Sequence, residues 1–207
     1  MTSQRRKAAI RSLDGLSVGD AFGECFFSIQ LNPLSLQMHL SSRTPPNWQW
    51  RWTDDTAMAV SIIEVLDRHG EINQGDLAAT FGKRYAWDDR RGYGGTAHGI
   101  LRAINGGQPW SEVAPSVMSG CGSMGNGAAM RVAPLGAFFA NDPDEIVNQA
   151  VRSAEVTHAH LEGQAGAAAV ALAAAFMVNA VELSPTAAWS PFFEFILKVL
   201  QTAKHGG

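Results

Sequence analysis

Apolar residues recur at helical spacing along most of the chain. Between residues 58 and 104 they fall three or four positions apart in three groups: Met58, Ile62, Val65 and Leu66; Leu77, Ala78, Phe81 and Tyr85; and Ala97, Ile100, Leu101 and Ile104. This period places one apolar stripe on one side of a helix, whereas a strand would alternate every second residue. The pattern predicts an all-α fold, a compact bundle of helices that cross one another.

Further helices are predicted from their capping signals and composition. The segment Asp142–Glu145 reads DPDE, in which an aspartate can cap, a proline fits the first helical position and an acid follows in the first turn. Ser190–Pro191 gives a similar start signal before the amphipathic stretch Phe192–Leu200. The alanine-rich segment Ala165–Val181 is short for a membrane span, so we expect a buried core helix there.

Two segments interrupt the helical pattern. Ser28–Arg51 contains three prolines and few charges, which predicts a long irregular connection of the kind that often carries function. Ser119–Gly127 holds four glycines in nine residues. No fixed-period repeat or linker is evident, and we expect residues 1–207 to form one domain.

Composition and charge limit the classes of partner. Hydrophobic residues make up 46% of the chain and charged residues 17%, which is typical of a globular protein. The net charge is −3 with no run of five like charges, so neither nucleic acid nor a membrane surface is expected as the main partner. Because Cys25 and Cys121 are too few for a disulfide framework and no secretory signal is evident, we expect a cytoplasmic protein.

Trp52–Thr56 is the first segment with candidate chemistry. It places two carboxylates and two hydroxyls just ahead of the apolar residues that begin at Met58. Hard oxygen donors at this density suit magnesium or calcium. The alternative is that Thr53 is an N-cap and that the two aspartates complement the helix dipole, which accounts for most acidic helix starts.

Two glycine-rich segments, Gly92–Thr96 and Gly122–Arg131, precede further helices. Glycine allows the backbone to approach a ligand, and free amides at a helix start favour phosphate, although a tight turn between helices is the simpler interpretation. Arg131 is either a charge partner for phosphate or part of a surface salt bridge. His158 and His160 are two residues apart and do not share a helix face, so a polar cap is the simplest interpretation of this pair.

Taken together, five segments resemble the ADP-ribosylglycohydrolase family, and in particular its dinitrogenase reductase-activating glycohydrolase members. The resemblance covers roughly residues 13–175. The segments occur in the family's order: GDAFG at residues 19–23, WTDDTAMAV at 52–60, GYGGT at 92–96, GNGAAMRVAPLG at 125–136 and THAHLEGQAGA at 157–167.

The resemblance implies a magnesium-dependent enzyme that hydrolyses the glycosidic bond between ADP-ribose and a protein or small-molecule acceptor. It implies Mg²⁺ ligands at Thr53, Asp54 and Asp55, with both aspartates also in the catalytic site. It implies an ADP-ribose cleft lined by Ser123, Gly125, Asn126, Gly127 and His158. Glu24 is the candidate for the acid that follows the GDAFG segment, although the common family spacing falls on Phe27.

The resemblance also implies a second aspartate-rich segment, similar to GGDTDT, near the C-terminus. This chain has no aspartate after Asp144 and ends LKVLQTAKHGG, so we expect a C-terminally truncated member with an incomplete metal site. Three interpretations follow: a glycohydrolase with impaired activity, a catalytically inactive ADP-ribose-binding protein, or a purely structural product. We also expect self-association, because the apolar side of Phe192–Leu200 would be left uncovered.

Overall fold

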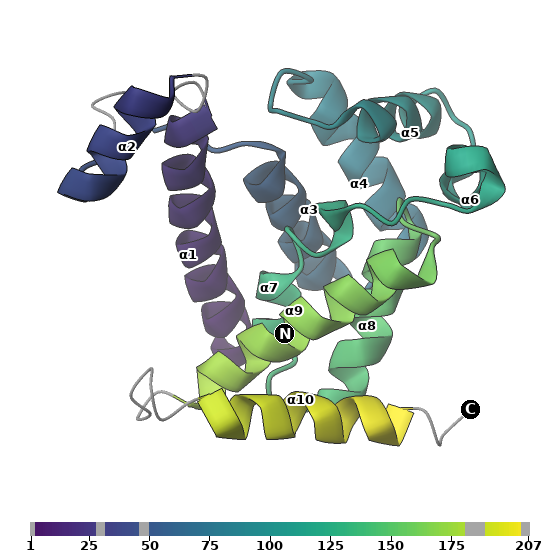
Figure 1. The fold of residues 1–207 in the computed structure, drawn as a ribbon. Helices are drawn as coiled ribbons and strands as arrows, with labels where there is room; N and C mark the ends of the chain where they lie inside the picture. Colours follow the sequence, from purple (N-terminus) through teal and green to yellow (C-terminus); the bar gives the residue numbers. More distant parts are fainter. Residues whose placement is uncertain (1–2, 28–31, 46–49, 181–188, 204–207) are drawn as a thin grey trace.

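The computed structural model describes residues 3–27, 32–45, 50–180 and 189–203, and the regular elements within these ranges are all helical (Figure 1). The predicted all-α fold is therefore confirmed. The elements are α1 (Ser3–Phe27), α2 (Pro33–Ser42), α3 (Asp54–His69), α4 (Gln74–Trp87), α5 (Gly95–Asn105), α6 (Trp110–Gly120), the short 3₁₀ helix η1 (Asn126–Ala128), α7 (Ala133–Phe138), α8 (Pro143–Glu155), α9 (Leu161–Asn179) and α10 (Trp189–Ala203).

Helix α3 lies at the centre of the bundle, packed against α1, α4 and α7. Helix α9 covers α7 and α8, and α10 packs across the ends of α8 and α9 (Figure 1). The apolar positions predicted from periodicity form the core, since Ile62, Leu66, Leu77 and Ile100 are buried in it. Burying such side chains contributes about 1.5–3 kcal/mol each, which is the main stabilisation of a bundle of this kind.

Small residues allow α7 and α9 to cross in backbone contact. A Cβ built at Gly136 of α7 would overlap the carbonyl oxygen of Ala171 of α9 and lie 2.7 Å from its Cα atom. Helix α9 is long and apolar enough to cross a membrane by length and composition alone. It packs against α7, α8 and α10 through a side made mostly of alanine, so the predicted helix is present, but only 33% of its apolar stretch is buried.

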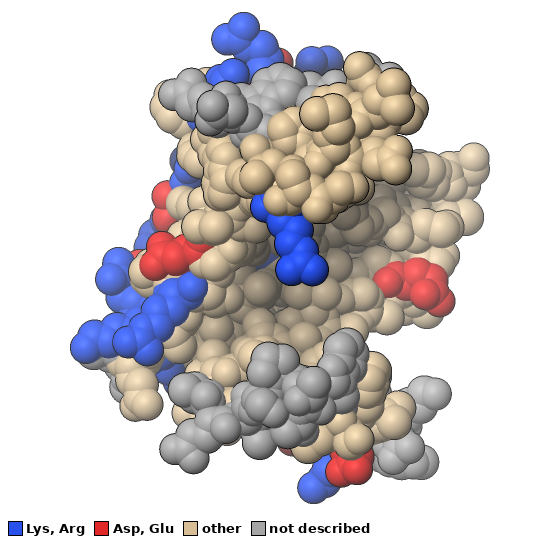
Figure 2. All heavy atoms as spheres, turned by 60° about the vertical axis from the view of Figure 1, so that its left-hand side comes forward, with Lys and Arg blue, Asp and Glu red and all other residues tan. Residues whose placement is uncertain are grey.

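The interpretation of Ser28–Arg51 as an irregular connection is wrong for its central part, because residues 33–42 form helix α2. The Asn32 side chain accepts a hydrogen bond from the Ser35 amide at 3.2 Å, and Pro33 occupies the first turn. No side chain of α2 is buried. Figure 2 turns the α1 and α2 side toward the viewer and shows a largely uncharged, hollowed face. Residues 28–31 and 46–49 lie outside the described residues.

The other predicted helix starts agree with the structure. The Asp142 side chain caps α8 by accepting a hydrogen bond from the Glu145 amide at 3.3 Å. Helix α10 begins at Trp189, one residue before the predicted signal at Ser190. Sequence patterns located these helices because both the capping side chain and the apolar stripe are local features.

Candidate functional site

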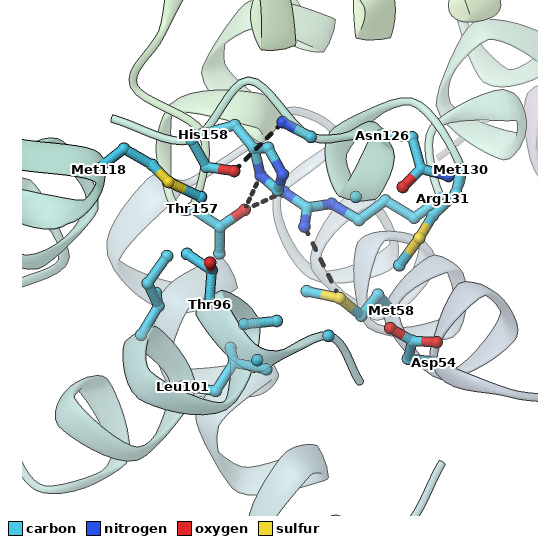
Figure 3. A pocket seen from close by; sticks show the side chains of 17 residues that line it. Asp54, Met58, Thr96, Leu101, Met118, Asn126, Met130, Arg131, Thr157 and His158 are labelled. Carbon is cyan, nitrogen blue, oxygen red and sulfur yellow. Dashed lines mark hydrogen bonds between the residues drawn. The ribbon is translucent and has the colours of Figure 1, made fainter. Parts of the chain in front are cut away.

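The candidate site consists of two adjoining hollows where several helices begin, and Figure 3 shows the residues that line the inner one. The inner pocket has a volume of about 220 Å³ and lies between the starts of α3 and α5, the Ser123–Gly127 loop and His158. The second, here called the acidic hollow, has a volume of about 670 Å³ and includes Asp20 and Asp55. Both hollows are lined by Asp54, Gly94, Asn126 and Met130. The positive ends of helix dipoles therefore meet at a site that also contains carboxylates.

Asp20 of α1 holds the start of α3 in place. Its carboxylate accepts hydrogen bonds from the Thr53 amide at 2.7 Å and the Thr53 hydroxyl at 2.6 Å. It also accepts from the Thr56 amide at 3.2 Å and the Thr56 hydroxyl at 2.6 Å. Thr53 occupies the N-cap position, as one interpretation predicted, but its own side chain makes no capping bond. An aspartate from another helix serves as the cap instead.

Asp54 and Asp55 are carboxylates in an unfavourable environment for negative charge. Burial raises the pKa of Asp54, and the nearby charge of Asp20 raises it further. Burial, followed by the charges of Asp20 and Asp54, raises the pKa of Asp55 to about 6. A bound cation would relieve this repulsion, because an opposite charge favours the ionised form of a carboxylate.

The donor set fits one loosely held cation. Thr53, Asp54 and Asp55 all line the acidic hollow and offer only oxygen ligands, the type that magnesium prefers. Within the described ranges, however, no group of three histidine, cysteine or acidic side chains is arranged to hold a metal ion. Glu24 is exposed and lines the same hollow, one turn beyond Asp20 on α1. The structure therefore brings the predicted catalytic residues to one hollow, and water would have to supply most of the coordination.

Arg91 joins the glycine-rich segment Gly92–Thr96 to the start of α3. Its guanidinium stacks 3.6 Å from the centre of the Trp52 ring and donates a hydrogen bond to the Trp52 carbonyl at 3.1 Å. The Arg91 carbonyl in turn accepts a hydrogen bond from the Asp54 amide at 2.7 Å. Gly92 has φ +88°, a left-handed conformation that favours glycine. This segment therefore positions the carboxylates as well as lining the pocket.

The loop around Ser123–Gly127 packs tightly on His158. A Cβ at Gly127 would lie 2.8 Å from Cε1 and 3.0 Å from Nε2 of the His158 ring. The Ser123 hydroxyl accepts a hydrogen bond from the Gly125 amide at 3.3 Å, which tightens the loop. The predicted cleft residues Ser123, Gly125, Asn126, Gly127 and His158 therefore all line one pocket (Figure 3).

The two histidines differ in their surroundings. His160 is the N-cap of α9 and accepts a hydrogen bond from the Glu162 amide at 3.1 Å, so the polar-cap interpretation holds for this residue. His158 is buried beside the inner pocket, and burial together with the charge of Arg131 lowers its pKa to about 3. His158 is therefore neutral at physiological pH.

Arg131 is not part of a surface salt bridge. The side chain is fully buried, and no carboxylate in the described ranges pairs with it. Its guanidinium instead donates to the Ser153 carbonyl at 2.8 Å and the Thr157 hydroxyl at 2.9 Å. The alternative of a partner for phosphate stays a prediction, since Arg131 also lines the inner pocket.

Sequence reasoning missed Asp20 and Arg91 as site residues. Asp20 is the second residue of the GDAFG segment, which lies in the uninterrupted helix α1. Its contact with Thr53 spans 33 positions, so no local pattern reveals it. The position of Asp20 within a quoted motif was the available signal.

Comparison with known proteins identifies the family. The profile of the ADP-ribosylglycohydrolase family matches residues 1–204. The chain is 38% identical over 136 residues to ADP-ribosylhydrolase ARH3 of Xenopus tropicalis, an alignment that covers 65% of this chain and 38% of the relative. It is 30% identical over 209 residues to ADP-ribosylhydrolase ARH3 of Danio rerio, an alignment that covers 94% of this chain and 54% of the relative. An uncharacterized Escherichia coli protein, YegU, is 32% identical over 127 residues, an alignment that covers 59% of this chain and 36% of YegU. These alignments span about half or less of each relative. The match over nearly all of its length shows that the chain belongs to the ADP-ribosylglycohydrolase family.

Proposed function

We propose that this site hydrolyses the glycosidic bond between ADP-ribose and an acceptor, with magnesium as cofactor. The observation that carries the proposal is that Asp54 lines both hollows, so the carboxylates lie at one end of a glycine-lined pocket that also contains His158. The vertebrate relatives named ADP-ribosylhydrolase ARH3 support this class of reaction.

The inner pocket suits the diphosphate of ADP-ribose. Gly94 and Gly95 begin α5, and Gly125 precedes η1, so backbone amides without helical partners lie near the pocket wall. Such amides and the positive ends of helix dipoles favour phosphate oxygens. His158, Asn126 and Ser123 add polar side chains to a wall whose exposed area is mostly apolar.

The acidic hollow suits the ribose and the bond to be cleaved. Hydrolysis develops positive charge at the anomeric carbon, and the carboxylates of Asp54 and Asp55 would stabilise that charge. Thr53, Asp54 and Asp55 would hold magnesium, which orients hydroxyls and makes bound water more acidic. Glu24 is exposed on the same hollow and is the candidate for accepting a proton from the attacking water.

A second function, ADP-ribose binding without turnover, is favoured by one observation. In the part of the chain that the structure describes, no three-ligand metal group is present. Three neighbouring oxygen donors leave most of the coordination shell to water, so the 207-residue chain should hold magnesium weakly and turn over slowly. The inner pocket does not depend on that ion for its shape, because Gly127 packs on the His158 ring and the Gly125 amide is bonded to the Ser123 hydroxyl.

Calorimetry and a release assay on the 207-residue chain test both functions. We expect at most one weak magnesium site, lost in Asp54→Ala and Asp55→Ala and kept in Asp14→Ala, an exposed carboxylate on α1. Slow release of ADP-ribose from serine- or arginine-modified peptides, abolished by Asp54→Ala, would support the hydrolase. Binding of ADP-ribose without release would support the second function. Two tight magnesium sites, or no binding of ADP-ribose, would contradict the assignment of the site.

A further inference from the structure

The buried Arg131 guanidinium has an unusual environment. It is fully buried, and its contacts are the Ser153 carbonyl at 2.8 Å, the Thr157 hydroxyl at 2.9 Å, the Met58 sulfur at 3.7 Å and the Phe81 ring at 4.5 Å. Burial lowers its pKa to about 9, against the opposing effect of the charge of Asp54, so it remains charged at neutral pH. Burying a charge without a direct ion pair costs free energy, so the guanidinium has a role beyond filling the core.

The directions of the hydrogen bonds around Thr157 follow from simple chemistry. A guanidinium only donates, so the Thr157 hydroxyl oxygen must accept from Arg131. The same oxygen lies 2.8 Å from Nδ1 of His158, and no other acceptor contacts this hydroxyl among the described residues. Donation of the threonine hydrogen to Nδ1 satisfies both groups, whereas an Nδ1–H would leave that hydrogen without an acceptor among the described residues. A neutral imidazole that accepts at Nδ1 carries its hydrogen on Nε2.

The geometry also locates the Nε2–H group. A Cβ built at Gly127 would lie 3.0 Å from Nε2, and one built at Gly125 would lie 3.8 Å from it. Nε2 therefore lies on the glycine-loop side of the ring, and His158 lines the inner pocket (Figure 3). The Nε2–H group of His158 is therefore a hydrogen-bond donor on the side of the pocket next to the glycine loop.

We infer that Arg131 is a positioning residue that acts through Thr157 to hold His158 in its neutral Nε2–H tautomer. His158 then offers a fixed donor to an anionic oxygen of the ligand without carrying charge itself. The identity of that oxygen as part of ADP-ribose rests on the proposed function, whereas the relay from Arg131 to His158 does not.

The charges around His158 agree with a neutral ring. Arg131 is the cation whose charge acts on it, and burial acts in the same direction. The glycines that approach the ring from the loop and from α9, Gly125, Gly127 and Gly163, bring no charge to it. The His158 ring therefore stays neutral and protonated at Nε2 between about pH 5 and pH 8, a range in which an ordinary histidine changes its charge.

Nitrogen-15 NMR of the histidine rings in the ligand-free 207-residue chain tests the relay. In the wild type we expect His158 to have an unprotonated Nδ1 and a protonated Nε2 from about pH 5 to pH 8. Thr157→Ser keeps the hydroxyl and should keep this tautomer, while Thr157→Val should give a mixture. Arg131→Lys should restore the tautomer that Arg131→Met loses. If Arg131→Met does not fold, the comparison of the His158 tautomer in Thr157→Ser and Thr157→Val tests the inference.

A wild-type ring protonated at Nδ1, or a tautomer unchanged in Thr157→Val, would overturn the inference. Titration with ADP-ribose then separates it from the proposed function. We expect Thr157→Val to bind about tenfold more weakly than Thr157→Ser, since a fixed donor to a charged group is lost. If the wild type shows the expected tautomer but does not bind ADP-ribose, the proposed function fails and the relay stands.

Discussion

Replacing Asp20 should separate its hydrogen bonds from its charge. Its carboxylate accepts four hydrogen bonds from Thr53 and Thr56, at 2.6 to 3.2 Å, and so caps α3 from α1. Asp20→Ala leaves two amides at the helix start without this acceptor. Asp20→Asn can still accept three of the bonds through its carbonyl oxygen, while the Thr53 hydroxyl turns to accept from the amide group.

The magnitude follows from these contacts. Loss of a helix cap costs up to about 2 kcal/mol, and loss of a hydrogen bond to a charged group costs about 1.5–3 kcal/mol. The four bonds share one carboxylate and are not additive, and removing its charge also relieves Asp55. We therefore expect Asp20→Ala to lower the free energy of unfolding by about 2–4 kcal/mol, and Asp20→Asn by about 1 kcal/mol.

Urea denaturation followed by circular dichroism at pH 7 measures these differences, provided that the denaturant slope is unchanged. Thermal unfolding should show a loss of roughly 5–15 °C for Asp20→Ala. Glu24→Gln, one turn further along α1 and exposed, is the matched control and should lie within about 0.5 kcal/mol of the wild type. If Asp20→Ala has the same free energy of unfolding as Glu24→Gln or as Asp20→Asn, the capping role is refuted.

Three further predictions concern the acidic hollow, the glycine loop and the last helix. The pKa of Asp55 rises from 3.8 to about 6 on folding, so the folded state binds this proton more tightly. The free energy of unfolding without magnesium should therefore increase as the pH falls from about 6 to 4, relative to Asp55→Asn, by less than the roughly 3 kcal/mol of the full pKa difference because solvent screens this partly exposed carboxylate. An equal pH dependence in both proteins would contradict this. Gly127→Ala should weaken ADP-ribose binding at least about tenfold, because its Cβ would lie 2.8 Å from the His158 ring. Gly99→Ala is the control, since a Cβ there meets nothing within 4 Å. Equal affinities in the two variants would exclude the clash. Phe193 and Leu197 of α10 are 52% and 56% exposed, so gel filtration should show a species larger than a monomer that Phe193→Ser with Leu197→Ser reduces; a monomeric wild type would disprove this.

Local signals predicted most of the fold. The helices around Ile62, Leu77 and Ile100 were evident because each carries its own apolar stripe. The three prolines of Ser28–Arg51 predict an irregular connection, yet Pro33 lies in the first turn of α2, where a helix tolerates proline. Its Asn32–Pro33 start combines a cap and a first-turn proline, like the Asp142–Pro143 start that was recognised before α8.

The site was predictable only in part, because its geometry depends on contacts between distant segments. The resemblance identified Asp54, Asp55 and His158, and the structure places Asp54 between the two hollows. The sequence could not show that Asp20 caps α3 or that Arg131 is buried, since a charged side chain is mostly found at the surface. Both depend on packing that involves more than one helix.

The close crossing of α7 and α9 restricts how this protein can vary. At Gly136 the obstacle to a side chain is the main chain of Ala171, including its carbonyl oxygen, which every amino acid possesses. A second substitution at position 171 therefore cannot make room for a larger residue at position 136. Helix α9 would have to move, and α9 begins at Leu161, three residues after His158. In a library that randomises both positions, every folded variant should retain glycine at position 136. Position 171 should vary among the residues that its own surroundings accept, and no residue there should compensate for the loss of Gly136.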